Sequence, residues 1–414
     1  MGTSIRNIEF RLYPTKSQEV TLGGWLALHG ELYNAALQER RDAYRKCGIS
    51  ITYNHQQNDL PAVKEYRPEL IPLGSHAIQE TVRRVDRAFR AFFRRIKTGN
   101  APGYPRFKSK DRFDSFCYPD PAGWKIIKQN KLRVSNLGEI PMRGKPRIPL
   151  TAGTPRTLTI KRQDQKWFAI CAVQYPESAL RRNQSYTGRM IGIDVGCSSL
   201  AVTSDGDFID SPKTLKQARQ KLSIAQKALS RKARGSKRRG EARRRVSALH
   251  GKVARKRKDF LHQFAAAIVC LYSFVAVEKL LLSNMTRSAR GTAGKPGRNV
   301  KQKAGLNRSL LDASIGTLFS LIAYKAEEAG AQFVKVAPHH TSQNCFWCGQ
   351  NVPKELSVRV HVCPSCGFVQ DRDYNAALNI LVKGLIQTGW EPSEAWSRVA
   401  AAVKRETATM PLAA

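Results

Sequence analysis

The spacing of apolar residues changes from strand to helix and back over the first part of the chain. Residues 4–13 alternate between apolar and polar positions, which is typical of a strand. Apolar residues then recur every three or four positions over 17–46 and again over 75–97, as they do on one face of a helix. Beyond residue 100, short alternating segments separated by proline and glycine predict further strands. The pattern therefore predicts a small β domain into which a helical region is inserted.

The second part of the chain begins with a different pattern. The apolar run MIGI leads into Asp194, and a second strand and a turn follow, as at the β-hairpin start of an RNase H-like fold. A carboxylate in an otherwise buried strand costs free energy unless something binds it; a turn-capping role is the alternative. A later buried strand, residues 273–280, carries Glu278 near its end and fits another strand of the same fold.

The charge of the chain changes this picture most. Lys and Arg number 70 against 32 Asp and Glu, which gives a net charge of +38, far more than solubility requires. Residues 211–260 alone hold 19 basic residues and two acids, and an apolar stripe opposite them predicts two packed helices, broken near Gly235 and Gly240. Such a field points to a polyanion, most simply nucleic acid; a nuclear localisation signal is the alternative for this run. The predicted nucleic-acid-binding residues are Arg83, Arg87, Arg90, Arg94, Lys237, Arg238, Arg239, Arg243, Arg244, Arg245 and Lys256.

Four of the nine cysteines form two C-x-x-C pairs, Cys345 with Cys348 and Cys363 with Cys366. Two tight turns of this kind can offer four thiolates to one tetrahedral ion, which is the ligand set of a structural zinc ribbon. Four cysteines leave no open coordination position, so this zinc should hold structure and not take part in chemistry. A redox motif or a disulfide pair is the alternative, and either would need a thioredoxin-like or secreted context that the chain lacks.

The other five cysteines are scattered, and we interpret them as buried thiols in a reducing cytoplasm. The N-terminus shows no signal-peptide core, and no stretch reaches the roughly 18 apolar residues of a membrane helix. We therefore expect a cytoplasmic protein associated with the nucleoid.

Two more carboxylates follow the ribbon. In the string DRDYNAALNIL, Asp371 and Asp373 stand at the start of a predicted helix, where the helix dipole favours acid and where a capping role is the alternative. Together with Asp194 and Glu278, one of them completes a set of three acids. Carboxylates are hard oxygen ligands for Mg²⁺, and two such ions roughly 4 Å apart can clamp a scissile phosphate. The set therefore predicts magnesium-dependent phosphodiester hydrolysis.

Several strings resemble one known family. IGIDVG, VAVEKL, HHTSQNCFWCG, CPSCG and DRDYNAALNI are similar to the three RuvC motifs and the zinc ribbon of TnpB, the insertion-sequence nuclease related to type V CRISPR effectors. LYNAALQERRDAY and GYPRFKSK also resemble this family, so the likeness covers nearly the whole chain. It implies that Asp194, Glu278 and Asp373 are the catalytic acids and magnesium ligands, with Asp371 a weaker candidate for the third.

The resemblance also implies a fold and its domains. We expect an α/β fold with an additional small β domain, in two lobes: an N-terminal wedge-like β-barrel with a helical recognition insertion, and a C-terminal RNase H-like (RuvC) domain with an inserted zinc ribbon. The predicted boundaries are 1–14 with 101–185 for the wedge, 15–100 for the recognition insertion, 186–340 for RuvC motifs I and II, 341–370 for the ribbon, 371–386 for RuvC motif III, and 387–414 for a flexible tail.

The implied activity is that of an RNA-guided DNA endonuclease. Its cofactors would be two Mg²⁺ ions, one structural Zn²⁺ and a guide RNA from the transposon end. Its partner would be double-stranded DNA carrying a short adjacent motif, with one protomer per RNA. A compact type V CRISPR effector, a non-catalytic RNA-guided regulator and a DNA-strand transferase are the alternatives.

Overall fold

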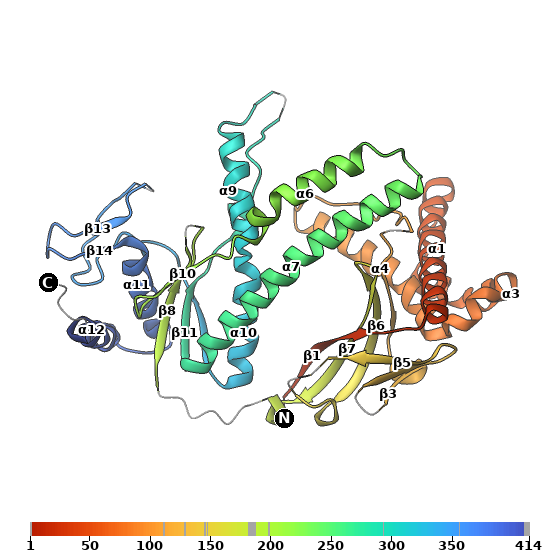
Figure 1. The fold of residues 1–414 in the computed structure, drawn as a ribbon, viewed down its shortest axis with the longest axis horizontal. Coiled ribbons are helices and arrows are strands. Elements are labelled where there is room, and N and C mark those ends of the chain that lie inside the picture. The colour runs from red at the N-terminus through yellow and green to blue at the C-terminus, as the bar shows by residue number, and fades with distance from the viewer. Residues whose placement is uncertain are drawn as a thin grey trace. The chain divides into compact units, whose positions relative to one another are not determined.

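A computed structural model describes residues 2–409, apart from 111, 128–129, 145, 147, 181–187, 198, 293 and 356. The chain forms two compact units, Met1–Leu180 and Arg181–Ala414 (Figure 1). None of the helices in these described segments has the length and apolar character needed to cross a bilayer.

A seven-stranded antiparallel sheet is the framework of the first unit. Its order is β2-β6-β7-β1-β5-β4-β3, so the first strand of the chain lies in the middle. That strand pairs along its whole length with β7 and at its end with β5. The strands are β1 (Thr3–Leu12), β2 (Ser115–Tyr118), β3 (Trp124–Ile127), β4 (Lys131–Val134), β5 (Gly138–Arg143), β6 (Thr154–Gln163) and β7 (Lys166–Pro176).

Helices fill the long connection between β1 and β2. They are α1 (Lys16–Cys47), α2 (Tyr53–Asn58), α3 (Leu60–Tyr66) and α4 (Ser75–Lys97), with a 3₁₀ turn at Pro68–Leu73. A capping box formed by Thr15 and Gln18 starts α1, and Gly48 ends it in the left-handed conformation. Gly23 and Gly24 have low helix propensity and could interrupt a helix, but they lie within one continuous helix here. The apolar stripes of α1 and α4 pack together, so the helices follow the predicted periodicity.

Aromatic side chains of the first unit divide into two groups. Phe113, Phe116, Tyr118, Trp124 and Trp167 are buried in its core, as expected for aromatic residues in strands. The side chains that precede the strands differ, because Tyr104 is 46% exposed and Phe107 is 41% exposed.

A five-stranded mixed sheet organises the second unit, in the order β10-β9-β8-β11-β12. Its strands are β8 (Met190–Asp194), β9 (Ser199–Thr203), β10 (Phe208–Asp210), β11 (Phe274–Glu278) and β12 (Gln332–Val336). The first three form an antiparallel meander, and β11 pairs in parallel with β8 on one side and β12 on the other. The central strands β8 and β11 are thus the ones that end in Asp194 and Glu278.

In the described part of the second unit, six long helices and one short helix accompany the sheet. They include α6 (Thr214–Ser230) and α7 (Lys237–Leu271), which pack against each other and break around Gly235, at φ +86°. Gly240 lies inside α7 and does not break it. The short helices are α5 (Glu177–Leu180), in the first unit, and α8 (Leu282–Met285).

Two expectations for the second unit were wrong. Residues 284–307 are rich in glycine and lysine, which predicts a mobile loop, and the apolar spacing over 308–329 predicts one helix after it. Instead, α9 (Val300–Ala313) begins within the predicted loop and α10 (Ile315–Ala329) follows after a break at Ser314. Glycine and lysine suggested a loop, yet Leu310 and Ala313 give α9 a buried face.

Residues 387–414 were expected to be a flexible tail, but 392–409 form a helix, α12 (Pro392–Thr409), and 410–414 lie outside the described residues. Ala395, Val399 and Ala400 are buried in a core shared with α11 (Arg372–Gln387), and the Trp396 indole donates to the Phe346 carbonyl at 2.8 Å. Burial of this small-residue stripe stabilises a segment whose composition gave no clear pattern. The two short strands of the ribbon are β13 (Val360–Val362) and β14 (Val369–Asp371).

The cysteines outside the two C-x-x-C pairs were expected to be buried. Only Cys171 of these five is, whereas Cys47 and Cys270 are exposed and Cys117 and Cys197 are intermediate.

Candidate active site and metal centre

Two of the predicted acids lie side by side at the carboxyl ends of adjacent strands in the five-stranded sheet. β8 and β11 run parallel, with Ile193 opposite Val277. The next residues, Asp194 and Glu278, are therefore neighbours at the carboxyl ends of adjacent strands. Strands that are parallel end at the same edge, which is where open α/β sheets carry their ligands.

Close packing of α11 brings the third acid to the same place. Gly192 of β8 faces this helix so closely that a Cβ there would lie 2.8 Å from the Leu381 Cβ, so only glycine fits. Asp194 follows two residues later on the same face of the strand, and Asp373 precedes Ala377, another neighbour of Gly192, by one helical turn. Because side chains repeat every two residues along a strand and about every four along a helix, Asp373 lies over Asp194.

The charges of the three acids interact. Burial raises the pKa of Asp194, and the carboxylates of Glu278 and Asp373 raise it too; against the opposing effect of Arg372, these causes together bring it to about 8. Burial also raises the pKa of Glu278, to which Asp373 adds. Like charges that raise one another's pKa lie close together in a low-dielectric site. The structure thus brings together Asp194, Glu278 and Asp373 from three distant segments.

Asp371 and Asp373 have different surroundings. The Asp371 carboxylate accepts from the backbone N–H groups of Asp373 (2.8 Å) and Tyr374 (3.2 Å), so it is the N-cap of α11. Asp373 is paired with Arg372 at 2.9 Å and with Arg359 of the ribbon segment at 3.5 Å. The capping alternative therefore holds for Asp371, while Asp373 faces the other acids.

Glu278 is oriented by residues that the sequence analysis did not single out. The Thr341 hydroxyl is hydrogen-bonded to the Glu278 carboxylate. Asn379 of α11 donates to the Thr341 carbonyl at 2.9 Å, and both Asn375 and Asn379 donate to the Asn344 carbonyl at 2.8 Å. The helix that carries Asp373 thus also fixes the segment that positions Glu278. The two asparagines, four residues apart in DYNAALN, were the available signal.

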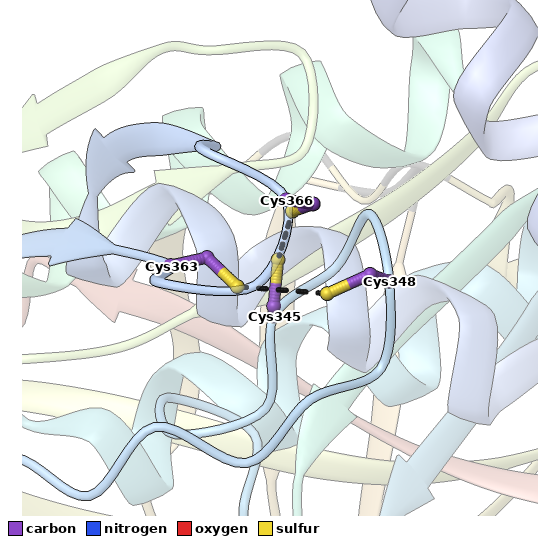
Figure 2. Close-up of side chains that lie close together, drawn as sticks. All are labelled: Cys345, Cys348, Cys363 and Cys366. Carbon is purple, nitrogen blue, oxygen red and sulfur yellow. Dashed lines mark hydrogen bonds between the residues drawn. The ribbon is translucent and has the colours of Figure 1, made fainter.

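The two C-x-x-C pairs converge as predicted (Figure 2). The four sulfur atoms lie within 4.8 Å of one another, with Cys345–Cys366 at 3.6 Å and Cys348–Cys363 at 3.5 Å. Four ligands about 2.3 Å from a tetrahedral zinc would be about 3.8 Å apart, which these separations nearly match. Gly349 and Gly367, one after each pair, adopt the left-handed conformation that the turns require. The residues therefore fit a structural zinc ion.

The predicted nucleic-acid-binding residues of α7 are mostly on its surface. Arg239 is the exception: its guanidinium donates to the carbonyls of Leu229 (3.1 Å) and Lys232 (2.7 Å) and closes the end of α6. The exposed ones are Lys237, Arg238, Arg243, Arg244, Arg245 and Lys256.

The predicted nucleic-acid-binding residues of α4 are exposed as well, but two of them form ion pairs with acidic residues of the same helix. Arg87 pairs with Glu80, and Arg90 pairs with Asp86 at 2.7 Å. The Arg83 guanidinium lies over the Tyr53 ring, 4.8 Å from its centroid, and Arg94 is exposed.

Family models match three segments of the chain. The model described as "Probable transposase" matches residues 169–289, "Cas12f1-like, TNB domain" matches 316–380, and "Helix-turn-helix domain" matches 1–48. In this structure the last segment holds the strand β1 and the single helix α1.

Two curated proteins are similar over almost the whole chain. The "Putative RNA-guided DNA endonuclease InsQ" of Escherichia coli K12 is 30% identical over 384 residues, 92% of this chain and 92% of that protein. A "Putative RNA-guided DNA endonuclease" of Streptomyces pristinaespiralis is 29% identical, over 92% of this chain and 89% of that protein. Among solved structures, Cas12f1 in its sgRNA–target DNA complex has the same fold, with a TM-score of 0.54 at 16% identity over 88% of this chain and 83% of that one. The chain belongs to the TnpB family.

Proposed function

We propose that this protein is an RNA-guided DNA endonuclease whose RuvC-type site consists of Asp194, Glu278 and Asp373. The observation that carries the proposal is the convergence of these acids at the carboxyl ends of β8 and β11, where burial and the charges of Glu278 and Asp373 raise the pKa of Asp194 to about 8. The names of the similar proteins from E. coli and Streptomyces support the activity.

The donor set fits divalent magnesium. Carboxylates that repel one another in a partly buried site are stabilised by a divalent cation, and oxygen is the ligand Mg²⁺ prefers. When bound, such ions activate water and stabilise the leaving oxygen of the scissile phosphate. Asp194, Glu278 and Asp373 would hold them.

The neighbouring residues keep these carboxylates in place. Thr341 orients Glu278, and Asp371 caps the helix that carries Asp373, which stabilises its first turn. Arg359 and Arg372 form ion pairs with Asp373 and so balance part of the negative charge of the three acids. These contacts preorganise the ligand oxygens for the cations and limit their mutual repulsion.

The cysteine cluster and the basic surfaces would bind the zinc ion and the nucleic acids. The cysteine cluster would hold one structural zinc, and the exposed basic residues of α4 and α7 would contact the phosphates of a guide RNA and of its double-stranded DNA target. We assign the β sheet of the first unit to the wedge, its helices to the recognition insertion, and the second unit to RuvC with its ribbon. The transposon end would supply the guide.

Substitution of Asp194 tests the proposal. Purified protein with its copurifying RNA should cleave matched duplex DNA in Mg²⁺, and Asp194→Ala should lower the rate by about 10³-fold or more because a metal ligand is lost. RNA and DNA affinity should stay within about twofold, since the basic surfaces are unchanged.

Asp210→Ala is the matched control, because Asp210 is an exposed acid of the same sheet. Unchanged cleavage by Asp194→Ala would refute the assigned site. Cleavage that survives complete removal of RNA would refute RNA guidance, and strand-transfer products would favour the transferase alternative.

A further inference from the structure

A cavity in the helical part of the first unit takes no part in the cleavage chemistry proposed above. It has a volume of about 790 Å³ and lies between α1, α2, α4 and the segment that carries Tyr104. Cavities of roughly 300–1,000 Å³ are the size that takes small ligands or parts of larger ones. The space is therefore large enough for a nucleobase with its sugar.

Aromatic rings form one wall of this cavity. The Tyr104 ring meets Phe89 at 5.6 Å and 90°, and meets Phe92 at 5.3 Å and 76°, both edge-on. Phe93 lies 5.2 Å from Phe92 and is 55% exposed. Tyr44, on α1, also lines the cavity and is 65% exposed. Rings that are held by contacts with one another and are still about half exposed offer stacking surfaces to a planar ligand.

A buried donor lies at the same cavity. Arg40 lines it and is only 7% exposed. Its Nε donates to Gln56 at 2.7 Å and its Nη1 to Asp86 at 3.2 Å. Its Nη2 is buried and has no hydrogen-bond partner among the described residues. A buried donor left without an acceptor costs free energy, so an incoming oxygen or ring nitrogen would be stabilised there.

The charge at the opening favours an anion next to that ligand. Arg90 lines the cavity with a side chain that is 80% exposed, and it shares Asp86 with Arg40. Two guanidinium groups therefore face one carboxylate. The excess positive charge suits the phosphate beside a base.

We propose that this cavity binds one unstacked nucleobase of the nucleic acid held by the protein. The base stacks on the exposed rings of Phe93 and Tyr104, a base carbonyl or ring nitrogen accepts from Arg40 Nη2, and the adjacent phosphate lies by Arg90. This proposal deepens the proposed function, because it names a site on the bound strand, and it requires nucleic-acid binding but not cleavage.

Photo-crosslinking locates the base. The probes are an oligouridine of about 12 nucleotides that carries one 5-iodouridine, and the DNA oligonucleotide of the same length with 5-iododeoxyuridine. After irradiation, we expect the full-length protein to be linked through Tyr44, Phe93 or Tyr104. Linkage by the RNA probe alone identifies RNA as the source of the base, and linkage by the DNA probe alone identifies DNA. Crosslinks confined to other elements would overturn the proposal.

Substitution then measures the contribution of the rings. Phe93→Ala combined with Tyr104→Ala should lower affinity for the crosslinking probe by about 5- to 100-fold. Both side chains are half-exposed, so the fold should be retained, which a thermal melt checks. Tyr66→Ala is the matched control, because Tyr66 is an exposed tyrosine of the same unit that does not line the cavity. It should leave affinity unchanged.

Two outcomes separate this proposal from others. If wild type and the double variant bind the probes and cleave DNA equally well, the cavity proposal fails and the endonuclease proposal stands. If mass photometry shows wild-type dimers that the double variant cannot form, with RNA affinity unchanged, a second copy of the chain covers these rings and the proposal is wrong.

Discussion

The four cysteines and the three carboxylates are both sets of possible metal ligands, but the ligand atoms of the cysteines lie much closer together. The four sulfur atoms lie within 4.8 Å of one another, and no acidic group in the described part of the chain forms so close a set. Burial and the charge of Asp373 instead raise the pKa of Asp194 and of Glu278, and Asp373 pairs with Arg359 and Arg372.

The chemistry of the two groups explains this difference. A thiol has an ordinary pKa near 8.5, so four cysteines can approach as neutral groups and release protons when a metal binds. A carboxyl group is normally ionised above pH 4, so three of them repel unless cations or protons intervene. The cysteines of the ribbon thus suit a closed structural site, whereas the acids suit the open magnesium site that we propose.

The largest expected effect is on the cleavage rate, and a comparison of substitutions at Asp373 and Asp371 tests the assigned carboxylate cluster. Asp373→Ala should lower cleavage by about 10³-fold or more with little change in Tm, because it removes a metal ligand. Asp371→Ala should cost about 0.5–2 kcal/mol of stability through loss of the helix cap, while cleavage falls by less than about tenfold. Rates on matched duplex DNA and thermal melts decide between them, and the reverse pattern would make Asp371 the ligand.

Removal of one cysteine tests the structural role of the cysteine cluster. Cys363→Ser should reduce bound zinc from one ion to none and unfold the ribbon, since structural zinc contributes on the order of 10 kcal/mol to folding of such modules. Cleavage should fall as well, because Thr341, which contacts Glu278, lies beside the ribbon.

Zinc content by elemental analysis and limited proteolysis measure this effect. Cys47→Ser, which changes an exposed thiol at the end of α1, is the control and should behave as wild type. A variant at Cys363 that is zinc-free but equally resistant to protease would contradict a structural role.

The smallest expected effect is the change in thermal stability with pH that the Asp194 carboxyl group causes. An unfolded chain releases the Asp194 proton near pH 4, whereas the folded, magnesium-free protein keeps it up to about 8. Between these values the folded state binds more protons, so its stability falls as pH rises. Asp194→Asn removes this loss, and its Tm should exceed that of wild type by at least about 2–4 °C above pH 8, with no difference near pH 4.

Thermal melts in magnesium-free buffer across this range provide the measurement. Addition of Mg²⁺ should then raise the Tm of wild type more than that of the variant. Parallel Tm curves for the two proteins would show that Asp194 does not have a raised pKa.

Much of the fold followed from local pattern. Helix α4 spans the predicted 75–97, and β1 spans nearly the predicted strand, because amphipathic periodicity there coincides with burial. Prediction failed where burial comes from distant residues: α12 forms because its small side chains pack on α11, and α9 forms despite its glycine because one face is covered. Local composition carries no information about those partners.

The sequence alone determined the family, the two C-x-x-C pairs, the excess positive charge and the three candidate acids, because these depend on residue type and spacing. Only the tertiary structure decided that Asp371 caps a helix while Asp373 faces Asp194, that Thr341 holds Glu278, and that Arg40 leaves a donor at an aromatic cavity. The role of a polar group depends on which atoms surround it, and those atoms come from segments far apart in the chain.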